Sequence, residues 1–304
     1  MGQYKIDKRR IVGRYILTPE PAGEKMAQFG GKIAVVTGST QGLGKAVAKI
    51  LAERGAEGIV ICGRDMVRGE ATTREIKETY GTNAIFIQFE QSSIEDCKNV
   101  ISISDKIFGR IDTLVNCAAI TNRGTILNTT PELFDAIFNT NVRGPFFLTQ
   151  KTLEVMIREQ IEGTIVNIGS MSAKAGQPFL TAYCASKGAL ATLTENIAFS
   201  VLRNRIRINS LNIGWMASEG ENLIQQSDGN PPDWLERAAP QQPFGRLIDP
   251  NEVARAVAFL ASSESGLMTG ANINYDQSIW GAYESSPHPS KKMTLSHDSL
   301  FHRD

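Results

Sequence analysis

Short apolar runs alternate along this chain with longer segments whose apolar residues recur every three or four positions. A short apolar run between turn residues is typical of a buried strand, whereas the longer spacing is typical of a helix with one covered face. Strands are predicted at 33–36, 59–62, 85–87, 111–115, 163–168, 206–211 and 271–275. Helices are predicted at 43–54, 66–79, 93–107, 131–139, 142–160, 180–202 and 252–261.

The strict alternation of strand and helix predicts the architecture. It implies an α/β fold of the Rossmann type, which is a doubly wound parallel sheet with helices on both faces. No break divides the pattern, so residues 31–283 are assigned to a single domain. Residues 1–30 are interpreted as an N-terminal extension and residues 284–304 as a polar C-terminal tail. Within the domain, 215–246 contains four prolines and is predicted to be an irregular substrate lid.

The composition excludes several classes of function. The 304 residues include 32 basic and 32 acidic side chains, which gives no indication of a nucleic-acid or anionic-membrane partner. No run of about 18 apolar residues is present, so no membrane-spanning helix is predicted. The four cysteines lack CxxC spacing, and all three histidines lie in the last 17 residues. We therefore expect reduced thiols, a cytoplasmic location and no metal centre.

The turn after the first predicted strand is rich in glycine. It reads Thr37-Gly38-Ser39-Thr40-Gln41-Gly42-Leu43-Gly44 and leads directly into a predicted helix. Glycines let the backbone approach a pyrophosphate, and a helix N-terminus offers free N–H groups and the positive end of a dipole. We therefore predict a dinucleotide site that involves Gly38, Thr40, Gly42, Leu43 and Gly44.

A second cluster of chemically active residues lies in the other half of the chain. Tyr183 and Lys187 are four positions apart in a predicted helix, so they share one face, and Ser170 precedes Tyr183 by thirteen residues. Oxidising an alcohol requires a base that takes the hydroxyl proton. The ordinary pKa of tyrosine is about 10, and bringing it near 7 requires about 4 kcal/mol. A neighbouring ammonium and a positive nicotinamide would both favour the phenolate.

The glycine spacing T-G-x3-G-x-G, followed by Ser170 and the Y-x3-K pattern of Tyr183 and Lys187, resembles the short-chain dehydrogenase/reductase family. The resemblance is to its single-domain branch and covers about residues 32–283. It implies that Ser170, Tyr183 and Lys187 are catalytic, that Ser170 bonds the substrate oxygen, and that Lys187 also binds the nicotinamide ribose. It further implies that Asn141 is a fourth catalytic residue, which holds a water linking Lys187 to solvent.

The resemblance also assigns residues around the cofactor and the substrate. The segment N-C-A-A stands where the family has N-N-A-G, and its matching residues Asn116 and Ala118 would line the adenosine side of the cleft. Ser218 follows a turn that matches the family's N-P-G except for its proline, and it would contact the nicotinamide amide. Trp215 opens the lid, where we place it against the substrate together with Ser170 and Tyr183.

The end of the second predicted strand bears on the choice of cofactor. A cation there accommodates the 2′-phosphate of NADP, whereas an acidic residue holds the 2′-hydroxyl of NAD. Arg64 predicts NADP(H) as the preferred cofactor, and the neighbouring Asp65 keeps NAD(H) as the alternative. The aromatic residues Trp234 and Phe244 in the lid either line a partly hydrophobic pocket or pack the lid down.

Together these features predict an NAD(P)(H)-dependent oxidoreductase that interconverts a small-molecule secondary alcohol and a ketone, with Tyr183 as general acid/base. A homotetramer or homodimer is expected, from the resemblance and from surplus apolar residues on the helices predicted at 142–160 and 180–202. Two alternatives stay open. One is a non-catalytic, nucleotide-sensing regulator on the same fold, and the other is a sugar-nucleotide epimerase or dehydratase.

Overall fold

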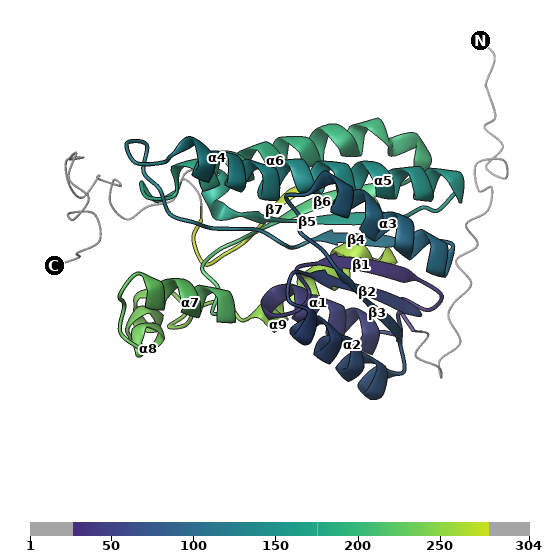
Figure 1. Cartoon of the computed structure of the whole chain (residues 1–304), viewed down its shortest axis with the longest axis horizontal. Helices are drawn as coiled ribbons and strands as arrows, with labels where there is room; N and C mark the ends of the chain where they lie inside the picture. The colour runs from purple at the N-terminus through teal and green to yellow at the C-terminus, as the bar shows by residue number, and fades with distance from the viewer. Residues whose placement is uncertain (1–26, 175, 280–304) are drawn as a thin grey trace, which may run out of the picture.

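The computed structural model describes residues 27–174 and 176–279. Within them, one sheet has the strand order β3-β2-β1-β4-β5-β6-β7, and every neighbouring pair is parallel (Figure 1). The strands are β1 (Ile33–Thr37), β2 (Gly58–Gly63), β3 (Asn83–Gln88), β4 (Thr113–Asn116), β5 (Thr164–Ser170), β6 (Arg207–Ile213) and β7 (Asn272–Tyr275). The chain direction across the sheet reverses between β1 and β4, where ligands bind in such sheets. The predicted doubly wound sheet is confirmed.

Helices cover both faces of the sheet. Helices α1, α2 and α9 lie on one face, and α3, α4, α5 and α6 lie on the other (Figure 1). Their bounds are α1 (Gly42–Glu53), α2 (Met66–Tyr80), α3 (Ile94–Phe108), α4 (Pro131–Phe138), α5 (Gly144–Arg158), α6 (Thr181–Ser200) and α9 (Pro250–Ala261). Among the described residues, no helix has the length and apolar character needed to cross a membrane.

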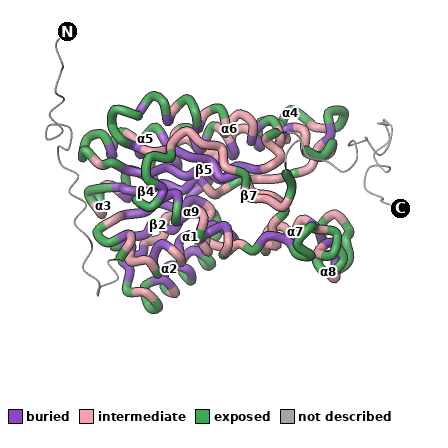
Figure 2. Tube along the Cα trace, turned by 180° about the vertical axis from the view of Figure 1, so that it is seen from behind, coloured by how far each residue is buried: buried purple, intermediate pink, exposed green. Residues whose placement is uncertain are grey.

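The sheet separates two hydrophobic cores. All residues of β1, β2, β4 and β5 are buried, and these strands run through the middle of the molecule (Figure 2). Successive side chains of a strand point to opposite faces. Val36 therefore packs in the cluster that contains Val47 of α1, whereas its neighbour Val35 packs in the cluster that contains Leu148 of α5. This double coverage explains why the strands read as continuous apolar runs.

Two predicted boundaries differ from the structure. Phe29 was assigned to the extension 1–30, but it is fully buried and packs in the core with residues of α1. The helices predicted at 131–139 and 142–160 are joined by a π-helical turn, Asn139–Arg143. Pro145 causes this irregularity, because it has no N–H to donate to the carbonyl four residues earlier. Residues 1–26 and 280–304, including the predicted tail, lie outside the described residues.

The lid is not irregular, which corrects the prediction for 215–246. It contains two helices, α7 (Glu219–Ser227) and α8 (Trp234–Ala238). The side chain of Ser218 accepts a hydrogen bond from the backbone N–H of Glu221 and so caps α7. Acidic residues in the first turn add a favourable interaction with the helix dipole. The prolines that indicated a loop lie between and after these helices.

Candidate active site

The glycine-rich turn (37–44) makes close backbone approaches that a side chain would block. Gly38 has a φ of +65°, and a Cβ there would lie 2.9 Å from the Cα of Ala118. A Cβ on Gly44 would lie 2.3 Å from the carbonyl oxygen of Gly38. By contrast, a Cβ on Gly42, whose φ is +53°, would meet no described atom within 4 Å. The turn is thus packed tightly on its inner side and open at Gly42.

The N-terminus of α1 is suited to an anion. Gln41 is the N-cap residue, and its side chain makes no capping hydrogen bond to the helix. The first-turn N–H groups therefore remain available, as in sites that hold phosphate groups. Leu43 is buried in the core, so only its backbone faces this site, and Thr40 packs against Gly63 of β2. The open cradle at Gly42 and these free donors fit the pyrophosphate of a dinucleotide.

The turn after β4 is fixed against the glycine-rich turn by one hydroxyl. The Oγ1 atom of Thr37 accepts hydrogen bonds from the backbone N–H groups of Cys117 and Ala118, each at 3.0 Å. Ala118 lies against Gly38 of the glycine-rich turn, and its contact with the adenosine stays a prediction. Asn116 differs from the expectation, because its side chain points into the sheet and donates to Oδ1 of Asn167 at 2.8 Å.

The predicted catalytic residues converge at the carboxyl end of β5. Ser170 is the last residue of β5, and Tyr183 and Lys187 lie in α6. The Lys187 ammonium is 5.7 Å from the centre of the Tyr183 ring and donates to the carbonyl of Ile168 at 2.8 Å. Lys187 is almost fully buried, and burial lowers its pKa to about 8. A tyrosine hydroxyl, a serine hydroxyl and a basic amine therefore share one cleft.

The surroundings of Tyr183 favour its neutral form. Burial raises the pKa of Tyr183 to about 12, although a hydrogen bond with Ser170 lowers it. Cys184, next in α6, and Glu221, in the lid, raise it further. Desolvation is the largest of these contributions, and the lowering expected from Lys187 together with an oxidised nicotinamide stays a prediction. The phenol is consequently held as a proton donor.

Asn141 organises the site without touching Lys187. It lies in the π-helical turn, where its side chain accepts from the backbone N–H of Ile120 at 3.0 Å and donates to the carbonyl of Ile120 at 2.9 Å. Its amide also donates to Oγ of Ser186 at 3.1 Å. Asn141 thus joins the loop after β4 to α6, the helix that carries Tyr183 and Lys187.

The residues beyond β2 present a cation near the cofactor cleft. Arg64 is 74% exposed and lies 3.8 Å from the carboxylate of Glu90. Asp65 caps α2, because its side chain accepts from the backbone N–H of Arg68 at 3.0 Å. The Arg68 guanidinium in turn bonds the side chain of Gln41 in the glycine-rich turn. Sequence reasoning missed Arg68, although its position one helical turn after Arg64 was visible.

The lid brings further polar residues to the cleft. The indole N–H of Trp215 donates to Oε1 of Glu221 at 2.8 Å. Trp234 is buried in a small core of the lid and stacks on Trp215 at 5.9 Å between ring centres. Phe244 is 76% exposed. The lid aromatics were expected either to line a pocket or to pack the lid down. Trp234 packs the lid down.

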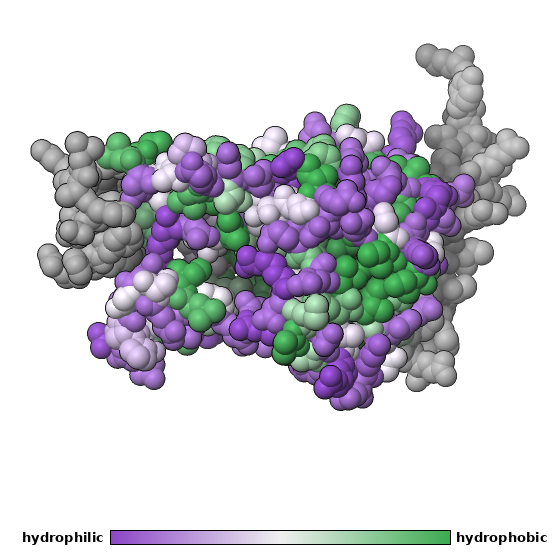
Figure 3. All heavy atoms as spheres, in the orientation of Figure 1, coloured by the Kyte–Doolittle hydropathy of each residue, from purple (hydrophilic) through white to green (hydrophobic). Residues whose placement is uncertain are grey.

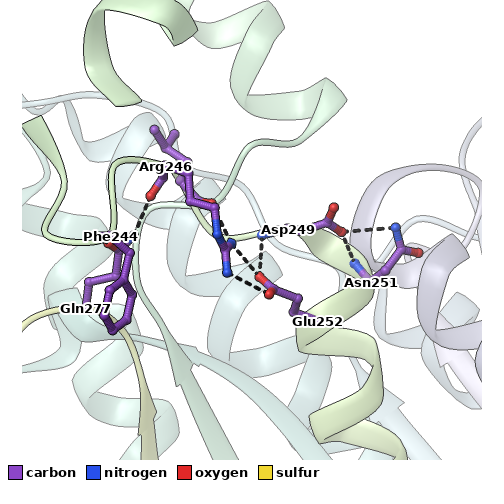
Figure 4. A network of polar contacts seen from close by, with 7 residues as sticks. Phe244, Arg246, Asp249, Asn251, Glu252 and Gln277 are labelled. Carbon is purple, nitrogen blue, oxygen red and sulfur yellow. Dashed lines mark hydrogen bonds and ion pairs between the residues drawn. The ribbon is translucent and has the colours of Figure 1, made fainter. Parts of the chain in front are cut away.

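Both sides of the lid are attached to the body of the molecule. Arg123, in the loop after β4, forms an ion pair of 2.5 Å with Asp228 at the end of α7. At the other end, Arg246 forms a bidentate pair with Glu252 of α9, and Gln277 bonds the backbone of Phe244 and Arg246 (Figure 4). Figure 3 shows a hollow between the lid helices and the rest of the molecule. The lid therefore borders this hollow.

The chain is similar in sequence and structure to known oxidoreductases, including two whose structures contain a nicotinamide cofactor. A family model described as enoyl-(acyl carrier protein) reductase matches residues 38–277. A protein of Thermotoga maritima described as an uncharacterized oxidoreductase is 36% identical, over 82% of this chain and 97% of its own. The solved structure of an actinorhodin polyketide ketoreductase with NADPH has a TM-score of 0.77 at 26% identity, over 82% of this chain and 97% of its own. The solved structure of an NAD⁺-bound xylitol dehydrogenase has a TM-score of 0.76 at 28% identity, over 82% of this chain and 99% of its own.

The fold, the glycine-rich turn and these matches define an oxidoreductase that acts on CH–OH groups with a nicotinamide cofactor. The chain belongs to the short-chain dehydrogenase/reductase family.

Proposed function

We propose that the protein interconverts a small-molecule secondary alcohol and its ketone, with Tyr183 as general acid and base. The observation that carries this proposal is the convergence of Ser170, Tyr183 and Lys187 at the carboxyl end of β5, beside the glycine-rich turn. When bound, the nicotinamide accepts a hydride from the alcohol carbon or donates one to the carbonyl carbon. In reduction, Tyr183 gives its proton to the carbonyl oxygen, and in oxidation it takes the proton from the hydroxyl.

The neighbouring side chains support this proton transfer. Ser170 lies close enough to Tyr183 to lower its pKa, and its hydroxyl can donate to the substrate oxygen and stabilise developing charge there. A pKa of about 12 keeps Tyr183 protonated at neutral pH, so that its proton is present for transfer to a carbonyl oxygen. Oxidation needs the phenolate, which the nearby Lys187 ammonium and the charge of an oxidised nicotinamide favour. Asn141 and Ser218 act by positioning α6 and α7, and Ser218 keeps a hydroxyl hydrogen to donate to the nicotinamide amide.

We propose NADP(H) as the preferred cofactor, with NAD(H) as the alternative. Arg64 is exposed at the end of β2, whereas the competing Asp65 is engaged as the cap of α2. A charge-assisted contact with the 2′-phosphate has a value of roughly 1.5–3 kcal/mol. Arg64→Ala should therefore weaken NADPH binding about 10- to 100-fold and leave NADH unchanged. If Arg64→Ala weakened the binding of NADPH and NADH equally, or if the wild type preferred NADH, Asp65 would become the residue that sets the cofactor preference.

We also propose a homotetramer or homodimer with a cytoplasmic location. Large apolar side chains are exposed on α5 and at the end of α6, among them Phe146, Ile157, Phe199 and Leu202. Large apolar side chains that the fold leaves exposed are candidates for burial at a protein interface. The described cysteines are all free, in keeping with a reducing compartment. Light scattering should give a multiple of 33.2 kDa, and a monomer at micromolar concentration would contradict the assembly.

The direct test of the proposed activity is an absorbance screen with NADPH and NADH against ketones, and with the oxidised cofactors against secondary alcohols. Consumption of reduced cofactor that depends on a ketone supports the proposal. The absence of turnover with every ketone and alcohol in a broad panel would contradict it.

A further inference from the structure

One carboxylate of the lid is oriented by hydrogen bonds from neighbouring side chains. Oε1 of Glu221 accepts two hydrogen bonds, from the indole N–H of Trp215 at 2.8 Å and from the side-chain amide of Gln225 at 2.6 Å. Gln225 is itself buried, and its carbonyl accepts from the amide of Asn230 at 2.7 Å. Oε2 of Glu221 has no hydrogen-bond partner within the described part of the chain. The carboxylate is therefore oriented, and one oxygen is left to accept.

The lid places this carboxylate within electrostatic reach of the reacting group. Glu221 belongs to the first turn of α7 and bonds Trp215, which follows the end of β6 two residues after Ile213, the residue paired with Ser170 of β5. Consistent with this placement, Glu221 contributes to the raised pKa of Tyr183. Across the cleft, the backbone N–H of Gly124 donates to the carbonyl of Phe179 at 2.8 Å, which ties the loop after β4 to the segment before α6. Arg123 of that loop lies over the Phe179 ring and pairs with Asp228 of α7. The walls of the cleft between Tyr183 and α7 therefore include several charged side chains.

The three aromatic residues of the lid have different surroundings. Trp234 is buried among lid residues and its indole N–H donates to Asn222, while Phe244 is largely exposed beside Gln277. The indole N–H of Trp215 is directed to Glu221. The lid therefore presents the Glu221 carboxylate beside the partly exposed ring of Trp215, and Leu223 of α7 is exposed as well.

We propose that the substrate is a polyhydroxylated alcohol or its ketone, of the sugar or sugar-alcohol class, and that Glu221 accepts hydrogen bonds from hydroxyl groups beside the reacting carbon. This inference rests on the proposed function. An ionised carboxylate can only accept hydrogen bonds, and adjacent hydroxyls supply donors for it. An apolar ketone would remove water from Glu221 without replacing those bonds, which is costly. Sites built to bond a substrate hydroxyl strongly reject analogues that lack it.

The test compares two ketones of similar size, xylulose and pentan-2-one, in NADPH- and NADH-linked reduction. Wild-type kcat/KM should be at least tenfold higher for xylulose. Glu221→Leu and Glu221→Gln should each lower kcat/KM for xylulose, by about 10- to 100-fold for Leu, and leave pentan-2-one within about threefold. Glu219→Gln, on the exposed side of the same helical turn, is the matched control and should behave like wild type.

The outcomes separate the inference from the proposed function. Reduction of pentan-2-one with equal or greater kcat/KM would overturn the inference and preserve the oxidoreductase activity. Equal losses for both ketones in the Glu221 variants would assign Glu221 to lid structure and also overturn it. A preference for an amino ketone would identify Glu221 as a cation site instead. Far-UV circular dichroism and thermal unfolding of the Glu221→Gln variant verify that the lid and the fold persist.

Discussion

Thr37→Val should weaken both the fold and the cofactor site, because one hydroxyl holds two turns together. Thr37 is fully buried, and its Oγ1 accepts from two backbone N–H groups, those of Cys117 and Ala118. Valine has nearly the same shape but cannot accept either bond. An unsatisfied buried donor costs about 1–3 kcal/mol, and because both residues are only partly buried we take the lower part of this range for each. The expected loss in the free energy of unfolding is about 2–3 kcal/mol.

Urea unfolding followed by circular dichroism measures this loss, and the matching decrease in Tm is roughly 4–12 °C for a domain of this size. Thr37→Ser retains the hydroxyl and is the control, so it should lose less than half as much stability. The turn at Gly38 abuts Ala118, so Thr37→Val should also weaken NADPH binding. A Thr37→Val protein as stable as wild type, or less affected than Thr37→Ser, would refute the reasoning.

Three further predictions concern the glycine-rich turn, the pKa of Tyr183 and the attachment of the lid. Gly44→Ala places a Cβ 2.3 Å from a backbone oxygen of the glycine-rich turn, so NADPH titration should show strongly reduced affinity; unchanged affinity would exclude this close approach. Glu221 raises the pKa of Tyr183, so Glu221→Gln should lower that pKa. In alcohol oxidation, kcat/KM should then begin to rise at a lower pH than in the wild type, and a rise at higher pH would contradict this direction. Because one ion pair joins the loop after β4 to α7, Arg123→Met and Asp228→Asn should each raise KM, and the double variant should be no worse than Arg123→Met. Additive losses would show that the two side chains act separately.

The sequence predicted the sheet and the grouping of Tyr183 with Lys187 because both depend on local patterns. Buried parallel strands read as apolar runs, and the four-residue spacing of Tyr183 and Lys187 places both on one face of α6. The lid was predicted less well. Its prolines indicated a loop, but the cap at Ser218 and the acidic first turn form α7 before the prolines begin.

The remaining differences arise from contacts between distant segments. Asn116 was expected to face the cofactor, but its partner Asn167 on β5 draws the amide into the sheet. Similarly, the electrostatic environment of Tyr183 depends on burial and on Glu221 of the lid, which no spacing along the chain reveals. Arg123 and Asp228 are 105 positions apart in the sequence, so their ion pair also required the fold.

The most direct test of the proposed activity is the turnover of Tyr183→Phe with a ketone that wild type reduces. Phenylalanine keeps the ring but removes the ionisable hydroxyl, so the proton has no donor at that position. We predict a loss of kcat of roughly 10²–10⁴-fold, with NADPH affinity and thermal stability close to wild type. Wild-type-like turnover in Tyr183→Phe would remove Tyr183 from proton transfer and contradict the proposed mechanism.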